Sequence, residues 1–289
     1  MVQGEASSVN DLLIVEASHE HYQELAAFLN QNIQTHRHLD WFSSLDWIGD
    51  HPYLIQYEED TIQGVLCTTP ENKDTAWIRV FAVAKPGEID ESWQQLLLRA
   101  IQKLRDEGVR RLAALALHSW FEALLVHSDF QNRQNINVLE WQGQLPPKTL
   151  CNPAITIRPM TCDDLLEVQR IDALAFPPLW QNSLAGLTKA LKQTGISTVA
   201  ILDDKLVGYQ ISTSMTICGH LARLAVDPNY QRQRIAYTLV YDLLQKFEDR
   251  GLWRVTVNTQ SDNFPSLNLY EKFGFSRTKE EIKVFELFL

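Results

Sequence analysis

The chain of 289 residues is 45% hydrophobic and 21% charged, with a formal net charge of −10. A chain of this length can form one or two globular domains, each large enough to bury a core. The acidic balance disfavours a nucleic-acid-binding protein, since such proteins present a basic face. It is compatible with cationic partners such as amines, although acidity also serves solubility.

Cysteine and histidine usage gives no metal motif. The four cysteines are scattered without a Cys-x-x-Cys pair, which predicts reduced thiols rather than a disulfide framework or a zinc site. The pairs His19/His21 and His36/His38 lack a third ligand at a sensible spacing, so we expect solvated histidines. No stretch is apolar enough to span a membrane and no signal-peptide core follows Met1, so we expect a cytoplasmic protein without a metal or a membrane partner.

Hydrophobic periodicity predicts strands and helices throughout the first half. Strands are expected at 12–15, 53–57, 61–67, 76–83, 111–117 and 135–141, and helices at 21–29, 92–104 and 120–126. Residues 31–50 read as short helices and loops. The proline-containing segment 146–153 is the expected linker, which gives domains at 1–145 and 154–289.

After this linker the order of elements begins again. Strands are expected at 155–157, 197–203, 205–214, 221–226, 253–259 and 283–288, and helices at 161–173, 183–192, 235–250 and 264–273. Short sequence pairs in the first half recur in the second half at a nearly constant offset along the chain. Ala82-Val83, for example, matches Ala225-Val226. We interpret this as an internal duplication. The alternative is two unrelated α/β domains that share an element order.

The stretch from Leu221 to Leu239 carries the first chemical signal. An apolar strand ends at the turn Asp227-Pro228-Asn229, and helical spacing begins at Ile235. Between them stands Gln231-Arg232-Gln233-Arg234-Ile235-Ala236. Backbone N–H groups and the helix dipole make this position an anion site.

A second signal follows at Asn263-Phe-Pro-Ser266-Leu-Asn-Leu-Tyr270-Glu-Lys-Phe-Gly274-Phe275. This segment resembles the Asn-x-x-(Ser/Ala)-x-x-Leu-Tyr-x-x-x-Gly-Phe signature of the GNAT acetyltransferase superfamily. The loop before the helix resembles the superfamily's (Gln/Arg)-x-x-Gly-x-(Gly/Ala) loop, with Arg234 in place of the first glycine. The resemblance covers about residues 154–289, and over the first half it rests on element order alone.

The resemblance implies two tandem GNAT-like domains, each a mixed, mostly antiparallel sheet flanked by helices. It implies that acetyl-CoA binds at Leu224, Ala225 and Val226 on the strand, at the loop Gln231–Ala236, and at Asn263, Ser266 and Tyr270. The strand positions offer backbone groups to the pantetheine arm. Arg234 can present its N–H to the pyrophosphate if its φ is negative. Asn263 could instead be only an N-cap.

Two side chains are candidates for catalysis. Tyr270 matches the tyrosine that protonates the leaving sulfur in this superfamily. A phenol with a pKa near ~10 has a proton to give at neutral pH. The alternative is that Tyr270 only packs in the core. His220 stands where arylalkylamine N-acetyltransferases carry a histidine base, and an imidazole with a pKa of ~6.5 suits proton removal. An idle histidine at a strand end is the alternative for His220.

The first half lacks the cationic loop and the tyrosine of the second half. Its turn, Lys85-Pro-Gly-Glu-Ile-Asp-Glu91, carries three acids that would repel a pyrophosphate, and Leu125 falls where Tyr270 sits. We therefore expect this domain to bind no CoA in the usual way and to shape the acceptor pocket or a homodimer surface. Phe176–Trp180 is a loop that borders the acceptor in relatives, or else closes the core.

The sequence thus predicts an acetyl-CoA-dependent N-acetyltransferase (class 2.3.1.-). Its acceptor would be a primary amine of a small molecule or a peptide N-terminus, which attacks the thioester directly. The second half also resembles ribosomal-protein N-terminal acetyltransferases, and the duplicated layout resembles mycothiol synthase. The competing hypothesis is a non-catalytic acyl-CoA sensor or interaction module.

Overall fold

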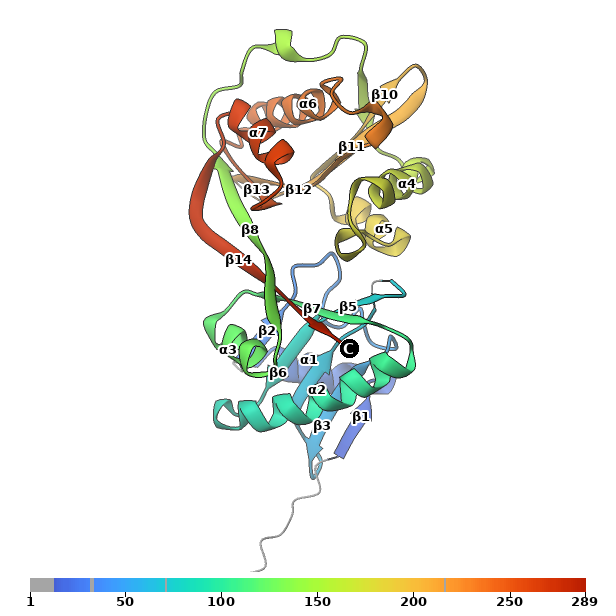
Figure 1. Ribbon diagram of the computed structural model, residues 1–289, viewed down its shortest axis with the longest axis vertical. Coiled ribbons are helices and arrows are strands. Elements are labelled where there is room, and N and C mark those ends of the chain that lie inside the picture. The colour runs from blue at the N-terminus through green and yellow to red at the C-terminus, as the bar shows by residue number, and fades with distance from the viewer. Residues whose placement is uncertain (1–12, 32–33, 71, 216) are drawn as a thin grey trace, which may run out of the picture. The chain divides into compact units, whose positions relative to one another are not determined.

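The computed structural model describes residues 13–31, 34–70, 72–215 and 217–289 (Figure 1). The start of the apolar run expected from Leu12 lies outside these ranges. The chain forms two compact units: residues 1–131 with Phe285–Leu289, and Asn132–Val284. Along the described ranges, no helix is both long and apolar enough to cross a membrane.

The first unit contains a five-stranded sheet in the order β1-β3-β4-β6-β2. Its strands are β1 (Leu13–Glu16), β2 (Gln34–Arg37), β3 (Tyr53–Glu58), β4 (Thr61–Cys67) and β6 (Val80–Val83). Two further strands, β5 (Thr75–Trp77) and β7 (Arg111–Ala116), pair in parallel. The helices are α1 (Tyr22–Leu29), α2 (Ile89–Asp106) and α3 (Ser119–His127).

Helices cover both faces of this sheet, which is why the strand β6 is apolar at every position. In β6, Phe81 and Val83 belong to the core that α2 and α3 complete. Val80 and Ala82 belong to the core on the other face, together with α1. Successive side chains of a strand point to opposite faces, so one short strand serves two cores.

The second unit orders its strands β9-β10-β11-β12-β13-β8-β14. They are β8 (Gln131–Trp141), β9 (Thr156–Pro159), β10 (Ile196–Leu202), β11 (Lys205–Ser214), β12 (Cys218–Val226), β13 (Arg254–Gln260) and β14 (Ser276–Phe288). The strands β12 and β13 run parallel, while the pairs β9–β10, β10–β11, β11–β12 and β13–β8 are antiparallel. The helices are α4 (Leu165–Ala175), α5 (Leu184–Gln193), α6 (Ile235–Asp249) and α7 (Phe264–Lys272).

The two units repeat one strand register, as the internal duplication predicts. In the first, Thr75 pairs with Arg111, and in the second Cys218 pairs with Arg254, both partners displaced by the same number of residues. The pairing of Gly64 with Val83 likewise matches that of Gly208 with Val226, one residue out of step. Two independent pairings therefore support the equivalence of β5–β6 with β12 and of β7 with β13.

Four segments differ from the sequence interpretation. The expected strand 76–83 is divided into β5 and β6, and Gln34–Arg37 forms a strand within the segment expected to hold short helices and loops. The strand β8, expected to close the first domain, pairs with β13 and places Trp141 in the core of the second unit. The last residues return to the first unit, where Phe285 is buried and Glu286 pairs with Arg111.

Candidate functional site

The strands β12 and β13 separate halfway along β12. Their parallel pairing runs from Cys218 with Arg254 to Leu221 with Val257. Beyond Leu221, none of the described strands pairs with β12 on that side, while β11 continues along the other side to Val226. A β-bulge at Ala222, where the register with β11 shifts, marks the separation. The second half of β12 thus has one open edge.

Backbone groups on this open edge belong to Leu224 and Val226. The N–H of Asp227 donates to the carbonyl of Val207 on β11 at 2.9 Å. Because hydrogen-bonded residues alternate along an antiparallel pair, Ala225 also directs its backbone at β11, and Leu224 and Val226 direct theirs away. The backbone groups of the predicted site residues Leu224 and Val226 therefore point to the open edge, whereas Ala225 has its backbone turned to β11 and its side chain buried.

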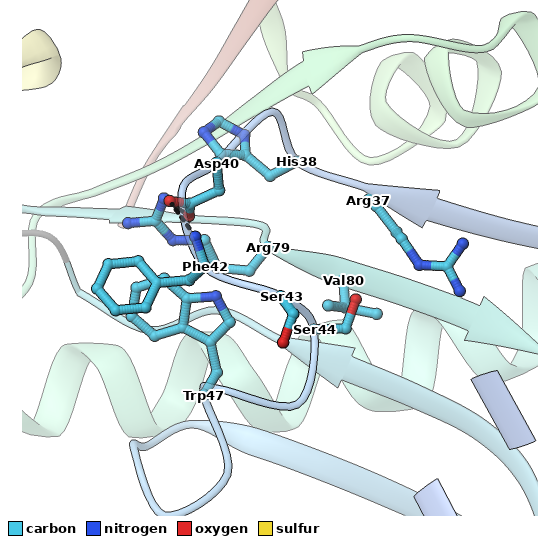
Figure 2. A pocket seen from close by; sticks show the side chains of 9 residues that line it. All are labelled: Arg37, His38, Asp40, Phe42, Ser43, Ser44, Trp47, Arg79 and Val80. Carbon is cyan, nitrogen blue, oxygen red and sulfur yellow. Dashed lines mark hydrogen bonds and ion pairs between the residues drawn. The ribbon is translucent and has the colours of Figure 1, made fainter. Parts of the chain in front are cut away.

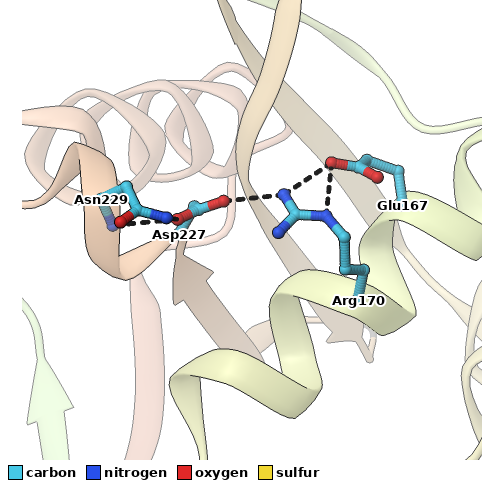
Figure 3. Close-up of polar contacts among 4 residues, drawn as sticks. All are labelled: Glu167, Arg170, Asp227 and Asn229. Carbon is cyan, nitrogen blue, oxygen red and sulfur yellow. Dashed lines mark hydrogen bonds and ion pairs between the residues drawn. The ribbon is translucent and has the colours of Figure 1, made fainter.

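The turn after β12 is anchored to α4 (Figure 3). The buried carboxylate of Asp227 accepts from Nη2 of Arg170 at 2.7 Å and from the N–H and side chain of Asn229 at 2.9 and 3.0 Å. Burial opposes the ionisation of Asp227, but these donors outweigh it and lower its pKa. Arg170 also donates to Glu167. This anchored turn fixes where the following loop begins.

The loop Gln231–Arg234 is exposed and ends at the first turn of α6. Arg232 and Arg234 both adopt left-handed backbone, with φ of 62° and 61°. The condition considered for Arg234, a negative φ, is therefore not met, and this arginine adopts the conformation that a glycine would take at lower cost. Ile235 is buried in the core, and Ala236 follows it into α6. The N–H groups at a helix start, together with two arginines, are the kind of groups that can bind an anion.

A residue from the expected linker supports this loop. The side chain of Asn152 donates to the carbonyl of Gln233 at 2.9 Å, and its N–H donates to Oγ1 of Thr238 at 3.0 Å. Thr238 in turn donates to the carbonyl of Arg234. The segment before β9 thus holds the loop from the side of the helix, a role that its sequence did not reveal.

Tyr270 lies in α7 and is 4% exposed. It shares a core with Leu221 of β12, and Leu224 packs against that core. Burial raises the pKa of its phenol, and no other group contributes to the shift. The proton therefore stays on the oxygen across the neutral range.

Asn263 is the N-cap of α7. Its side-chain oxygen accepts from the N–H of Ser266 at 3.3 Å, and its amide lies 3.5 Å from Oε1 of Gln260. The capping role considered for Asn263 is thus observed. Ser266 stands in the first turn of the helix, three residues after the cap, and contacts it through this bond.

His220 on β12 is paired with Thr256 on β13, one residue before the parallel pairing of the two strands ends. Its Nδ1 lies 2.8 Å from Oγ1 of Thr256. Burial lowers the pKa of His220 below its ordinary value, with a smaller opposing effect from Thr256. The imidazole is therefore neutral, and able to accept a proton, at pH 7.

His220 and Tyr270 belong to opposite faces of the sheet. Leu221 points into the core that Tyr270 shares, so the adjacent His220 points to the other face. On that other face β11 and β12 contact α4, since Tyr209 and Arg223 both bond Asp172. A proton acceptor and a proton donor thus flank the point where the strands separate, one on each face.

Arg223 and Asp172 are site residues that the sequence interpretation missed. Asp172 is fully buried in α4, and Nε of Arg223 donates to its Oδ2 at 2.8 Å. Nη2 of Arg223 also donates to the carbonyl of Trp180 at 2.6 Å, and the guanidinium lies 3.5 Å from the ring centre of Phe176. An arginine inside an apolar strand was the available signal.

The loop from Phe176 to Trp180 is tied to the strands on this face. Besides the bonds from Arg223, Nε1 of Trp180 donates to Oε1 of Gln134 on β8 at 3.0 Å. Nε2 of Gln134 donates to Asp262, just before α7, at 3.1 Å. The loop thus has a fixed place beside the point of separation.

The pair His36/His38 departs from the expectation of solvated histidines, since His38 is half-buried against Trp77. His36 is fully buried rather than solvated, and its ring stacks on Phe121 with centroids 3.9 Å apart. Burial lowers its pKa to about 3. Among the residues that the structure places, no three His, Cys, Asp or Glu side chains gather as metal ligands would.

Comparison with known proteins agrees with this geometry. Residues 165–275 match the Acetyltransferase (GNAT) family. An N-alpha-acetyltransferase of Saccharolobus solfataricus is 27% identical over 138 residues, which is 43% of this chain and 81% of that protein. The [ribosomal protein bS18]-alanine N-acetyltransferase of Escherichia coli is 31% identical over 74 residues, 26% of this chain, and the chain spans only half of that enzyme.

One similar solved structure extends over both units. A tandem GNAT protein from the clavulanic acid biosynthesis pathway superposes with a TM-score of 0.64, covering 96% of this chain and 98% of that one at 12% identity. At this identity the likeness concerns the fold, and it confirms the expected mixed α/β fold with two sheets flanked by helices. Within the second unit, residues 165–275 are thus similar to the Acetyltransferase (GNAT) family, in agreement with the resemblance seen in the sequence.

Proposed function

We propose that the second unit transfers an acetyl group from acetyl-CoA to a primary amine. One observation carries the proposal: the open edge of β12 lies between a cationic helix-start loop and a His–Tyr pair on opposite faces. Acetyl-CoA supplies the activated acyl group as a thioester. The chain's residues must hold its phosphates and arm, free the amine of a proton, and protonate the departing sulfur.

Binding is assigned to backbone groups more than to side chains. Leu224 and Val226 present the N–H and C=O groups that an extended pantetheine arm can pair with, as an added strand would. The loop Gln231–Ala236 presents N–H groups and two guanidinium groups to the pyrophosphate. Asn263 holds the start of α7 in place beside this edge, through its bond to Ser266.

Proton transfer is assigned to His220 and Tyr270. His220, neutral at pH 7, accepts the proton of the ammonium directly or through water on the α4 face. Tyr270 keeps its proton because burial raises the pKa of its phenol, so it can donate to the sulfur. Their opposite faces suit a direct attack in which the amine arrives on one side and the thiol leaves on the other.

The acceptor is assigned to the face covered by α4, α5 and the loop Phe176–Trp180. We favour the α-amine of a polypeptide over a small-molecule amine, because the two relatives compared above are named for α-amino acetylation. The net charge of −10 is compatible with either cationic acceptor.

Release of free CoA thiol, measured with acetyl-CoA and a panel of peptides and small amines, tests the proposal. Tyr270→Phe should lower kcat by about 10²–10⁴ with little change in the KM for acetyl-CoA. Tyr237→Phe is a matched control, because the buried hydroxyl of Tyr237 on α6 makes no hydrogen bond to a described residue. Equal turnover of wild type and Tyr270→Phe would remove the tyrosine as acid. Acetyl-CoA binding without acyl transfer to any acceptor would instead favour an acyl-CoA sensor.

A further inference from the structure

The first unit has no open strand edge at the place where the second unit has one. In the second unit the residues from Arg223 to Val226 follow the point where β12 and β13 separate. Their equivalents in the first unit form β6, which follows the point where β5 leaves β7. Here β6 is paired on both sides, with β4 on one side and with β2 on the other.

The strand β2 bonds the same backbone positions that are free in the second unit. The N–H of His38 donates to the carbonyl of Arg79 at 2.8 Å. The alternation of an antiparallel pair then makes Phe81 and Val83 the residues whose backbones bond β2. These two residues are the equivalents of Leu224 and Val226, and their partners are His36 and Gln34.

We infer that the chain fills the pantetheine slot of its first unit with its own residues Gln34–Arg37, so that each chain binds one CoA, at the second unit. This rests on the proposed function only for the CoA site of the second unit. In the first unit, an internal strand replaces the ligand's arm.

Side chains fix β2 in this slot. His36 is fully buried and stacks on Phe121 of α3. Nη2 of Arg37 donates to the carbonyl of Leu29, the last residue of α1, at 2.7 Å. The helices α1 and α3 both pack on the sheet to which β2 belongs. The strand is thus built into both layers of the unit and is not a loosely added edge.

The space beyond β2 is small, and its charged side chains are paired. Beyond Arg37 the chain borders a cavity of about 180 Å³ (Figure 2). Nη1 of Arg79 bonds Oδ2 of Asp40 at 2.7 Å, and its guanidinium lies 4.6 Å from the ring centre of Trp47. Ligand sites of drug size occupy ~300 Å³ or more. This cavity therefore has no room for a thioester arm together with an acceptor.

The phosphate loop has been lost as well. The turn after β6 is a single 3₁₀ turn, Pro86–Glu88, which leads directly into α2. Glu88, Asp90 and Glu91 stand at the start of that helix, and Lys85 is paired with Glu88 at 3.2 Å. Carboxylates at a helix start repel a pyrophosphate, so neither half of the CoA site survives in the first unit.

Residue-resolved hydrogen exchange on the free chain tests the filling of the slot. The amides of Phe81 and Val83 should exchange at least about 100-fold more slowly than those of Leu224 and Val226. Addition of CoA should slow Leu224 and Val226 and leave Phe81 and Val83 unchanged. Fast exchange at Phe81 and Val83 in the free chain, or their slowing by CoA, would overturn the inference.

Calorimetric titration with CoA tests the stoichiometry. Wild type should bind one CoA per chain, and the combined change Gln231→Glu, Arg232→Glu and Arg234→Glu should abolish all binding. Lys85→Glu in the first unit is the matched control and should bind like wild type. A second equivalent of CoA, or one that survives the triple change, contradicts a single site. If wild type binds no CoA, the proposed function fails, while exchange in the free chain still decides whether β2 covers β6.

Discussion

Arg223 of β12 donates through Nε to Oδ2 of Asp172 in α4, over 2.8 Å, and through Nη2 to the carbonyl of Trp180. One guanidinium therefore joins the strand at the open edge to the loop that covers the proposed acceptor face. The carboxylate is fully buried, so this ion pair is part of the packing of the second unit, and we propose that it also positions the loop.

Replacing Arg223 separates these two roles. Arg223→Ala leaves a buried carboxylate without its cation, and we expect a loss of about 3–5 kcal/mol in the free energy of unfolding. Arg223→Lys keeps the charge but cannot bond Trp180 and stack on Phe176 as the planar guanidinium does. It should raise the KM for the amine several-fold and leave the KM for acetyl-CoA unchanged. Equal changes in both KM values would argue against a role in positioning the loop.

Arg234→Gly should stabilise the second unit. Arg234 has a φ of 61°, a conformation that costs a residue with a Cβ about 1 kcal/mol relative to glycine. Chemical unfolding should detect a gain of that order. Arg234→Ala keeps the backbone strain and removes the guanidinium. The Kd values of the two variants for CoA therefore separate the effect of backbone strain from the effect of the charge. Tighter binding by Arg234→Gly than by Arg234→Ala would show that the backbone strain weakens binding, and weaker binding by Arg234→Ala than by wild type would show that the guanidinium contributes.

The pH dependence of turnover should report His220. Burial lowers its pKa, so the base form persists below pH 6.5, and the acid limb of kcat should lie on the low side of that value. His220→Gln should lower kcat and remove this limb. Thr256→Val, which removes the partner of Nδ1, should shift the limb while keeping part of the rate. A profile that is identical in wild type and His220→Gln would exclude the histidine as base.

Stability against acid should report His36 in the first unit. Its folded-state pKa of about 3 lies below the value of about 6.5 in an unfolded chain. Between these values the unfolded chain binds more protons, so stability is full above pH 6.5 and falls as the pH decreases towards 3. His36→Phe keeps an aromatic ring on Phe121 and should flatten this dependence. His127→Gln, at an exposed histidine, should leave it unchanged.

The sequence predicted those parts of the site whose residues are close together in the chain. The loop at Arg234 and the helix start at Asn263 are local patterns, and in the structure the first leads into α6 while the second is the N-cap of α7. The bonds of Arg223 to Asp172 and of Asn152 to Gln233 join residues 51 and 81 positions apart, and no local pattern encodes such pairs.

The strand β2 was missed for a related reason. Its sequence, Gln-Thr-His-Arg, lacks the alternation that marks a strand, because its one fully buried position is a histidine rather than an aliphatic residue. Backbone pairing with β6 stabilises this strand, because its side chains do not favour one. An edge that needs a partner can order a segment of poor strand propensity, and that requirement is visible only once the sheet is known.

The return of Phe285–Leu289 to the first unit makes this duplication a nested one. The second unit is an insertion between Gln131 and Phe285 in the sequence of the first. No single cleavage of the chain can therefore release both units whole. A fragment that begins at the expected boundary, residue 154, would lack β8 and Asn152, whereas one spanning 132–284 keeps both and leaves the first unit without its last strand.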